Sequence, residues 1–313
     1  MYWELKTGAE TGWDYSTRWM ISNESATDSS SADQSPKGHP LTTNLHETKA
    51  RYIVPVDLNA ILEKNARILA KYSDEVLDDQ VQAAFYKDKS DSLKEAIHKV
   101  LWSESMGVWL DYDIMNNKPR ETFICSNFFP LWTESMPEAS REEQSRRAVD
   151  YFAALTLDKY AGGVPTTFTY SGQQWDFPNC WPPLEHMMVQ GLENTGLDKA
   201  KELAYKVASK RVLGAYNNFL DKGHMFEKYD ASNMMRIGGG GEYEIQIGFG
   251  WTNGVVLDFL NMYGDRLDQE ADSRRLNVDA FGQSIAGKKP SGETAQKQVE
   301  ENTQSGERDA REP

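Results

Sequence analysis

Four carboxylates in this chain lie beside aromatic side chains, and this pairing points to chemistry. Asp14 follows Trp13 in GWDYS, Asp176 lies in QWDFPN, Glu227 in MFEKYD, and Glu242 directly after four glycines. Burial among bulky rings raises the pKa of a carboxyl group because it disfavours the charged form. A carboxylic acid with a raised pKa can act as a general acid near neutral pH. Paired carboxylates carry out glycoside hydrolysis: one protonates the leaving oxygen, and the other attacks or activates water.

The aromatic residues point to a sugar as the substrate class. The chain has 9 Trp, 14 Tyr and 12 Phe, and several Trp residues stand near Asp, Asn or Gln. Rings beside hydrogen-bonding groups suit a carbohydrate, which has apolar faces and hydroxyl edges. The tetraglycine Gly238–Gly241 matches neither a phosphate loop nor a dinucleotide fingerprint. Because glycine lets the backbone approach a ligand closely, we expect this segment to line the site or to form a lid.

Composition argues against several other functions. With 34 basic and 48 acidic residues, the net charge is −14 over 313 residues, which opposes binding to nucleic acid or to an anionic membrane. No stretch is apolar and long enough to span a bilayer, and the first residues do not resemble a signal peptide. Cys125 and Cys180 are too few for a disulfide scaffold, and the sequence contains no metal-ligand, Ser-nucleophile or Cys–His signature.

Helices are the elements that must position these carboxylates. Apolar periodicity, capping pairs and N-terminal prolines predict six helices, at 55–72, 91–102, 140–163, 181–193, 197–220 and 251–263. In the second, Ser92 and Glu95 fit a capping box. In the first, the apolar stripe consists of Leu58, Ile61, Leu62, Ile68 and Leu69. Strand signals are few and short, so the sequence predicts an all-α domain with its function in the loops.

Two segments differ in composition from the rest. Residues 22–50 are rich in Ser, Thr, Asp and Pro, which is typical of an exposed loop within the folded part, 1–263. Residues 264–313 hold one aromatic residue, Phe281, among polar and mixed-charge residues. Because they cannot bury enough apolar area to offset the entropy of ordering, we expect a disordered tail there.

The carboxylate-bearing segments resemble the motifs of the α,α-trehalase family. QQWDFPNCWPPLEH resembles the family's second signature, and GGGGEYEIQIGFGWTNGVVL its glycine-rich C-terminal motif. Six further segments match in the family's order: ETGWDYSTRW, IVPVDLNAIL, GVWLDYD, SNFFPLW, GGVPT and MFEKYD. The resemblance covers roughly residues 1–263. It implies an (α/α)6 barrel with a pocket at one end, and hydrolysis of trehalose to two glucose molecules with inversion, without a metal or organic cofactor.

The resemblance also implies roles for individual residues. Asp14 would be the general acid that protonates the glycosidic oxygen, and Glu227 the general base that deprotonates the attacking water. Residues expected to contact substrate or line its pocket are Gly12, Glu242, Trp175 and Asp176. In an inverting enzyme the two carboxyl groups stand about 6.5–9.5 Å apart, which leaves room for a water molecule.

Some features of the family are absent from this sequence. The first signature, rich in Gly and Arg and ending in Tyr-Trp-Asp, is missing, as is the segment carrying several sugar-binding arginines. We therefore expect the C-terminal portion of a trehalase, about half of the catalytic barrel, with helix faces exposed that a whole barrel would bury. Cys180 stands where the family usually has Gly or Ala. A sequon at Asn23 favours a secreted protein.

Two alternatives remain open. Orientation supplies a large part of catalytic power, so a chain with acid and base but without the arginines could be an inactive fragment that at most binds sugar. The chain could also be an inverting glycosidase of another (α/α)6 family that acts on glucans.

Overall fold

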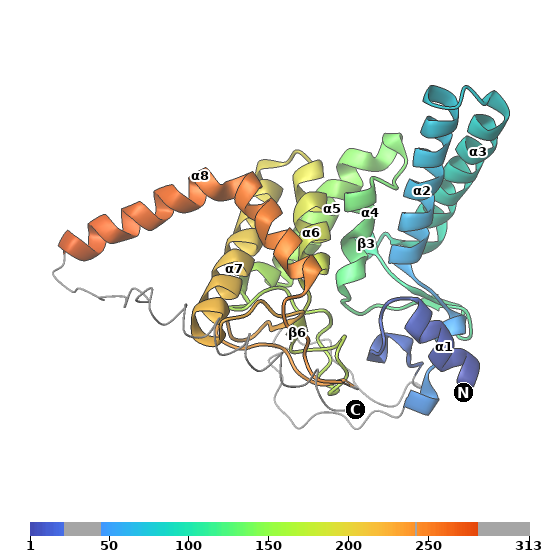
Figure 1. Ribbon diagram of the computed structural model, residues 1–313. Coiled ribbons are helices and arrows are strands. Elements are labelled where there is room, and N and C mark those ends of the chain that lie inside the picture. The colour runs from blue at the N-terminus through green and yellow to red at the C-terminus, as the bar shows by residue number, and fades with distance from the viewer. Residues whose placement is uncertain (22–44, 242, 281–313) are drawn as a thin grey trace, which may run out of the picture. The chain divides into compact units, whose positions relative to one another are not determined.

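Helices make up most of the described chain (Figure 1). The structure, a computed structural model, describes residues 1–21, 45–241 and 243–280. The helices are α1 (Tyr2–Glu10), α2 (Val56–Glu75), α3 (Gln80–Ala96), α4 (Phe129–Thr133), α5 (Arg141–Ala154), α6 (Pro182–Asn194), α7 (Asp198–Lys222) and α8 (Gly250–Ala280). The all-α prediction is confirmed, because each strand within these ranges is only two residues long.

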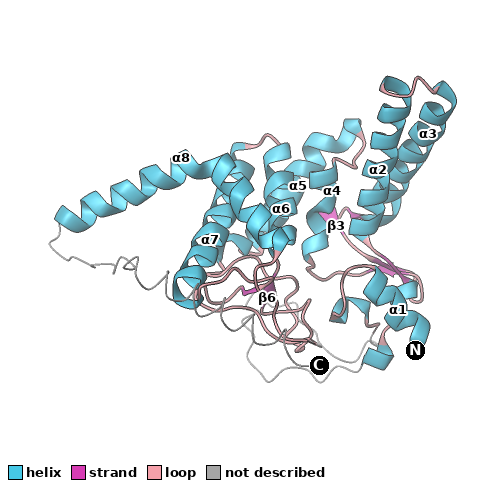
Figure 2. Cartoon of the chain, viewed as in Figure 1, coloured by secondary structure: helices cyan, strands magenta, loops and turns pink. Residues whose placement is uncertain are grey.

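The central helices form a row in which each packs on the next. Helix α3 packs on α2, α2 on α4, α4 on α6, and α6 on α7 (Figure 1). Long loops gather at one end of α6 and α7, around strand β6 (Figure 2). These loops carry the segments that the sequence marks for chemistry.

The short strands pair with one another and so connect the loops. Strand β1 (Ile53–Val54) pairs with β4 (Tyr112–Asp113), which pairs with β5 (Lys118–Pro119), and β2 (Trp102–Ser103) pairs with β3 (Val108–Trp109), all antiparallel. Strand β6 (Asn179–Cys180) pairs antiparallel with β7 (Tyr229–Asp230), with Cys180 opposite Tyr229. The last pair brings the QQWDFPN segment beside the FEKYD segment.

The predicted helix at 55–72 is confirmed, but its apolar stripe is not its buried face. Leu58, Leu62 and Leu69 are 47%, 45% and 43% exposed. The face turned inward contains Ala60 and Glu63 instead. Helix α2 packs on α3 and α4, and the buried Glu63 carboxylate accepts hydrogen bonds from the hydroxyl groups of Ser90 and Ser135. These hydrogen bonds allow the charged Glu63 to be buried on the inward face of α2. The sequence predicted that the leucine stripe would be the buried face instead.

Three predicted helix boundaries are wrong: the start of the helix predicted at 91–102 and the ends of those predicted at 140–163 and 251–263, the last of which continues to Ala280 in α8. Helix α3 begins at Gln80, because the Asp79 carboxylate accepts hydrogen bonds from two free N–H groups of its first turn, and the predicted capping pair lies inside the helix. Helix α5 begins after Ser140 as predicted but ends at Ala154, well before the glycine pair at 162–163.

The chain divides into two units, Met1–Gly264 and Asp265–Pro313. Helix α8 begins in the first and continues to Ala280. Residues 281–313 of the predicted tail, and residues 22–44 of the predicted loop with the sequon at Asn23, lie outside the described residues. These expectations therefore stay predictions. Residues 264–280 of the expected disordered tail differ from the expectation, because they are helical and form the second half of α8. Within the described ranges, no helix is both long and apolar enough to cross a membrane.

Candidate active site

Asp14 lies in the loop that follows α1. The indole Nε1 of Trp175 donates a hydrogen bond to Asp14 Oδ1 at 3.3 Å, and the Gln174 side-chain amide donates one to the Asp14 backbone carbonyl. Gly12, two residues earlier, has a φ of +83°, and a Cβ there would meet no atom within 4 Å. Gly12 thus provides the turn out of α1 and leaves open space near the carboxylate.

Trp175 is held by rings on both sides. Its ring lies parallel to that of Trp181, with centroids 3.9 Å apart and 7° between the planes, and the Trp13 ring is 5.2 Å away at 30°. Only 6% of Trp175 is exposed. Because the stack fixes the ring, the direction of its N–H group toward Asp14 is fixed as well.

The Asp176 carboxylate is fully occupied by the chain itself. Each of its oxygens accepts two hydrogen bonds, and the side chain has no exposed surface. The donors are Ser16 Oγ (2.6 Å), Thr17 N (2.8 Å), Thr167 Oγ1 (3.0 Å) and Ser171 Oγ (2.5 Å). Burial raises the pKa of Asp176, and these bonds oppose that rise. The carboxylate is therefore arranged to hold the segment after Asp14, with no oxygen left for a sugar.

A buried arginine anchors the same segment to α2. Arg18 forms two-pronged ion pairs with Asp57 and with Asp111, at 2.7–3.0 Å, and none of the three side chains is more than slightly exposed. Asp111 also accepts the backbone N–H of Val56 at 2.9 Å, at the start of α2. Burial opposes the charge on Arg18, but the two carboxylates outweigh it and raise the pKa of the guanidinium. The loop bearing Asp14 is thus fixed by charge as well as by hydrogen bonds.

Glu227 is buried, and one of its carboxylate oxygens accepts no hydrogen bond from the described residues. It is 1% exposed, and its backbone is held by Gln246 (N···O 3.1 Å) and by the Trp251 indole (2.9 Å). Oε2 accepts a long hydrogen bond of 3.5 Å from the Tyr243 hydroxyl, whereas Oε1 accepts none from any described residue. Burial raises the pKa of Glu227, against the nearby charge of Lys228. Such a carboxylate can accept a proton from a water molecule.

Lys228 and Gln174 connect the two carboxylate-bearing loops. The ammonium Nζ of Lys228 lies 3.7 Å from Glu227 Oε1, and it donates hydrogen bonds to Gln174 Oε1 at 2.9 Å and to the Gly240 carbonyl at 3.2 Å. Gln174 in turn donates its amide N–H to the Asp14 carbonyl. A continuous polar path therefore runs from the Asp14 backbone to the Glu227 carboxylate.

The structure brings four of the six predicted site residues into one region. Asp14 and Trp175 are in direct contact, with Gly12 in the same loop, and Glu227 is reached through the polar path. Burial raises the pKa of Tyr243, and the charges of both Glu227 and Asp14 add to that rise. The Tyr243 hydroxyl therefore lies close enough to both carboxylates for their charges to affect it. The Asp176 carboxylate bonds to none of these four residues, and Glu242 lies outside the described residues.

The tetraglycine packs tightly against the same loops. A Cβ on Gly240 would lie 2.3 Å from the Gly172 carbonyl, and one on Gly238 would lie 2.6 Å from Asn179 Oδ1. Gly240 must therefore be glycine because its backbone lies against that of Gly172, whereas a Cβ on Gly239 would meet no atom within 4 Å.

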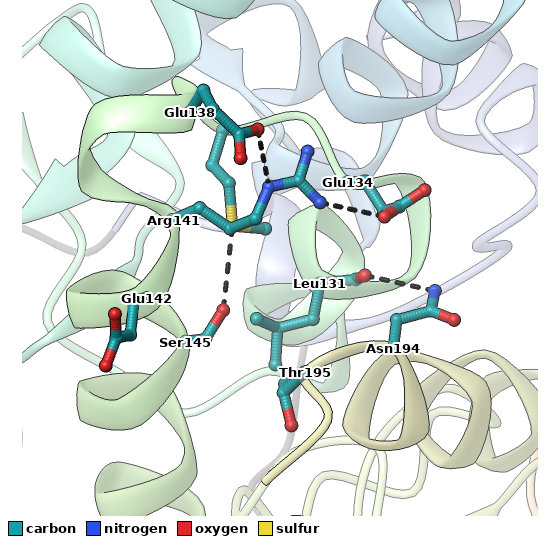
Figure 3. Close-up of a pocket in the computed structure, with 9 residues that line it drawn as sticks. Leu131, Glu134, Glu138, Arg141, Glu142, Ser145, Asn194 and Thr195 are labelled. Atoms are coloured by element: carbon teal, nitrogen blue, oxygen red, sulfur yellow. Dashed lines mark hydrogen bonds and ion pairs between the residues drawn. The ribbon is translucent and has the colours of Figure 1, made fainter.

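A separate cavity of about 240 Å³ lies among α4, α5 and the end of α6 (Figure 3). Arg141 reaches across it to Glu134 at 2.8 Å and to Glu138 at 3.0 Å. None of the predicted site residues lines this cavity, and its arginine is already paired. Within the described residues, no cluster of three or more His, Cys, Asp or Glu side chains could hold a metal ion.

Gln174, Lys228 and Tyr243 belong to the site but escaped prediction. Each lies within a motif segment, directly next to or close to a predicted residue. Their position in those segments was the only signal, because a buried lysine looks like a surface lysine in sequence.

A helical domain that joins a loop-borne carboxylate to a buried one has the arrangement of a helical glycoside hydrolase. The chain belongs to the trehalase family: the family model described as Trehalase matches residues 1–264. The chain is 43% identical to a trehalase of Apis mellifera over 269 residues, covering 86% of this chain and 40% of that protein. It is 38% identical to a trehalase of Homo sapiens over 268 residues, covering 86% of this chain and 42% of that protein.

A solved structure shows the same fold. Neutral trehalase Nth1 from Saccharomyces cerevisiae matches with a TM-score of 0.56 and 22% identity, over 71% of this chain and 40% of that one. The predicted fold class, part of an (α/α)6 barrel, is confirmed by this likeness. The chain spans less than half the length of the curated relatives it matches, which fits the expectation of a portion of a trehalase.

Proposed function

We propose that this chain carries the acid and base of a trehalase that hydrolyses α,α-trehalose to two glucose molecules with inversion. Glu227 is the general base and Asp14 the general acid. The observation that carries the proposal is the unused Oε1 of Glu227, buried beside a lysine and linked to Asp14 through Gln174. The family membership supplies the substrate class.

The reaction needs one proton acceptor and one proton donor on opposite sides of the bond. Glu227 Oε1 takes a proton from a water molecule as the water oxygen bonds to the anomeric carbon. The bond from that carbon to the glycosidic oxygen breaks, and its electrons go to the oxygen, which receives the proton of Asp14. Solvent then returns both carboxyl groups to their starting states.

The other predicted residues take supporting roles in this proposal. Trp175 orients the Asp14 carboxyl group through its indole N–H, and Gly12 leaves room for the sugar. Asp176 holds the loop behind Asp14 and does not touch the substrate. Glu242 contacts the substrate, as its position in the family motif implies.

Glucose release from trehalose by the purified chain tests the proposal, with helicity and tryptophan fluorescence measured on the same sample. Glu227→Gln and Asp14→Asn should each lower turnover by about 10²–10⁴-fold with the fold unchanged, because each removes a proton-transfer group. The matched control is Asp150→Asn, an exposed carboxylate on α5 that forms an ion pair with Lys199. Near wild-type turnover in either site variant would overturn the assignment.

The stereochemistry has its own readout. Proton NMR of the fresh products should show one β-glucose for each α-glucose, because inversion affects only the attacked ring. Two α-glucose molecules would indicate retention and would refute the inverting mechanism.

The second candidate function is sugar binding without cleavage. It is favoured by the partial coverage, since the chain spans 40% of the Apis mellifera trehalase. Calorimetry with trehalose distinguishes it: heat of binding without glucose release is its expected result. Maltose and maltotriose in the same assays test the glucan-acting alternative.

A further inference from the structure

Lys228 is a buried cation whose bonds go mostly to neutral groups. It has no exposed surface, yet the hydrogen bonds that it donates to described residues go to the Gln174 amide oxygen and the Gly240 carbonyl. Its distance to Glu227 Oε1, 3.7 Å, is that of an ion pair and too long for a hydrogen bond. The ammonium is therefore held near the carboxylate without occupying the oxygen that the reaction needs.

The orientation of the Gln174 amide follows from two of its partners. Its oxygen faces the Lys228 ammonium, which can only donate, and its NH₂ group faces the Asp14 carbonyl, which can only accept. Turning the amide over would place donor against donor and acceptor against acceptor. Gln174 is thus a fixed spacer between the lysine and the loop of Asp14.

We propose that Lys228 and Gln174 are positioning residues that couple the two carboxylates. Lys228 keeps Glu227 ionised while leaving Oε1 free, and Gln174 restrains the lysine so that it cannot move onto that oxygen. The same amide donates a hydrogen bond to the Asp14 backbone carbonyl. Gln174 and Lys228 together therefore fix the position of the acid relative to the base. This inference rests on the proposed function in assigning the roles of acid and base.

The electrostatics of the site are consistent with this arrangement. Among the described residues, the titratable and charged groups that face Glu227 are Lys228 and Tyr243, and the charge of Asp14 also acts on both of these. Burial lowers the pKa of Lys228, and Glu227 opposes that change. The only cation in this set is Lys228, so removing it leaves the hydrogen bonds from Gln246 and Tyr243 as the groups that oppose the effect of burial on Glu227.

The test is a pH titration of the Glu227 carboxyl carbon by ¹³C NMR, assigned by its loss in Glu227→Gln. Lys228→Met should move the titration midpoint to higher pH, because the stabilising cation is gone. Gln174→Met should move it to lower pH, because the freed lysine N–H can then bond to Oε1. The matched control is Lys210→Met, a half-buried lysine that bonds the Tyr160 carbonyl at 2.7 Å, away from the site. Its midpoint should stay at the wild-type value.

Opposite shifts in the two site variants support the proposal, since a merely structural lysine would produce neither. An unchanged midpoint in folded Lys228→Met would overturn it. If that variant does not fold, an unchanged or raised midpoint in Gln174→Met overturns it equally.

Turnover adds a second readout. Lys228→Met should lower kcat for trehalose by at least about tenfold with KM nearly unchanged, and should move the acid limb of the pH profile to higher pH. The titration needs no turnover, so a chain that releases no glucose refutes the proposed function while the NMR result still decides the role of Lys228.

Discussion

Replacing Asp176 tests whether this carboxylate supports the loop of the proposed acid. The Asp176→Ala change removes an acceptor that four donors share, at 2.5–3.0 Å. Three of the donors are hydroxyl groups, which can turn toward other acceptors. The fourth is the backbone N–H of Thr17, which cannot turn and would be left buried without a partner.

The magnitude follows from these contacts. A hydrogen bond to a charged group contributes about 1.5–3 kcal/mol, so four set an upper limit of about 6–12 kcal/mol. Two effects reduce it: the hydroxyl groups find other partners, and burial raises the pKa of Asp176, so the charge itself is costly to keep there. We expect a net loss of about 3–5 kcal/mol in the free energy of unfolding, comparable to breaking a buried charged pair. Asp176→Asn keeps one acceptor oxygen and should lose less.

Urea unfolding followed by tryptophan fluorescence measures this loss. With a slope of about 1–3 kcal/mol per molar urea, the Asp176→Ala midpoint should fall by at least about 1 M. Asp150→Ala, which removes an exposed carboxylate, should change stability by less than about 0.5 kcal/mol. A free energy of unfolding for Asp176→Ala within about 1 kcal/mol of the wild-type value would refute the reasoning. Asp176 would then again be a candidate for binding the sugar.

Three further changes test other parts of the fold. Gly163→Ala should lower the free energy of unfolding by more than about 3 kcal/mol, because φ is +139° and the new Cβ would lie 2.2 Å from Glu185 Oε1. A melting temperature equal to that of the wild type would contradict this close contact. Leu62→Gln should cost less than about 0.5 kcal/mol in urea, since the side chain is 45% exposed; a large loss would mean that something covers this face. Burial acts to raise the pKa of Glu4, but hydrogen bonds from Arg51 outweigh it and the pKa is lowered. Glu4 therefore stabilises the fold above its unfolded pKa and stops doing so as pH falls through its folded pKa, so the deficit of Glu4→Gln in urea should shrink from about pH 7 to about pH 3; a constant deficit would argue against it.

Sequence predicted the helices where local signals decide the outcome. Prolines at 182 and 183 start α6 because proline suits the first turn of a helix, and the long amphipathic run after it forms α7. Prediction from the sequence gave the wrong result where contacts between distant segments determine the structure. Which face of α2 is buried depends on the hydrogen-bonded Glu63, and no property of residues 56–75 alone reveals its serine partners on other segments.

The two carboxylates of the candidate site could be predicted from the sequence, but the two side chains that link them could not. Asp14 and Glu227 stand out because they lie beside aromatic residues in recognisable motifs. Gln174 and Lys228 acquire their roles only when the β6–β7 pair brings their loops together. Asp176 was expected to line the pocket because it lies in the family's second signature. The chain turns between Gln173 and Asp176, and the Asp176 carboxylate accepts hydrogen bonds from Ser16 and Thr167, partners that the sequence alone does not reveal.

The long sequence separation of the contacts around Asp14 has a consequence for how the protein folds. The hydrogen bonds from Ser16 to Asp176 and from Gln174 to Asp14 each join residues 160 positions apart. Loops of that length close at a large entropic cost, whereas helices adjacent in the chain, such as α6 and α7, meet through a short connection. Helical signal should therefore develop before the site exists, and a sample can be fully helical yet incompetent. The environment of Trp175, which reports the long-range contacts, is the better measure of a finished active centre.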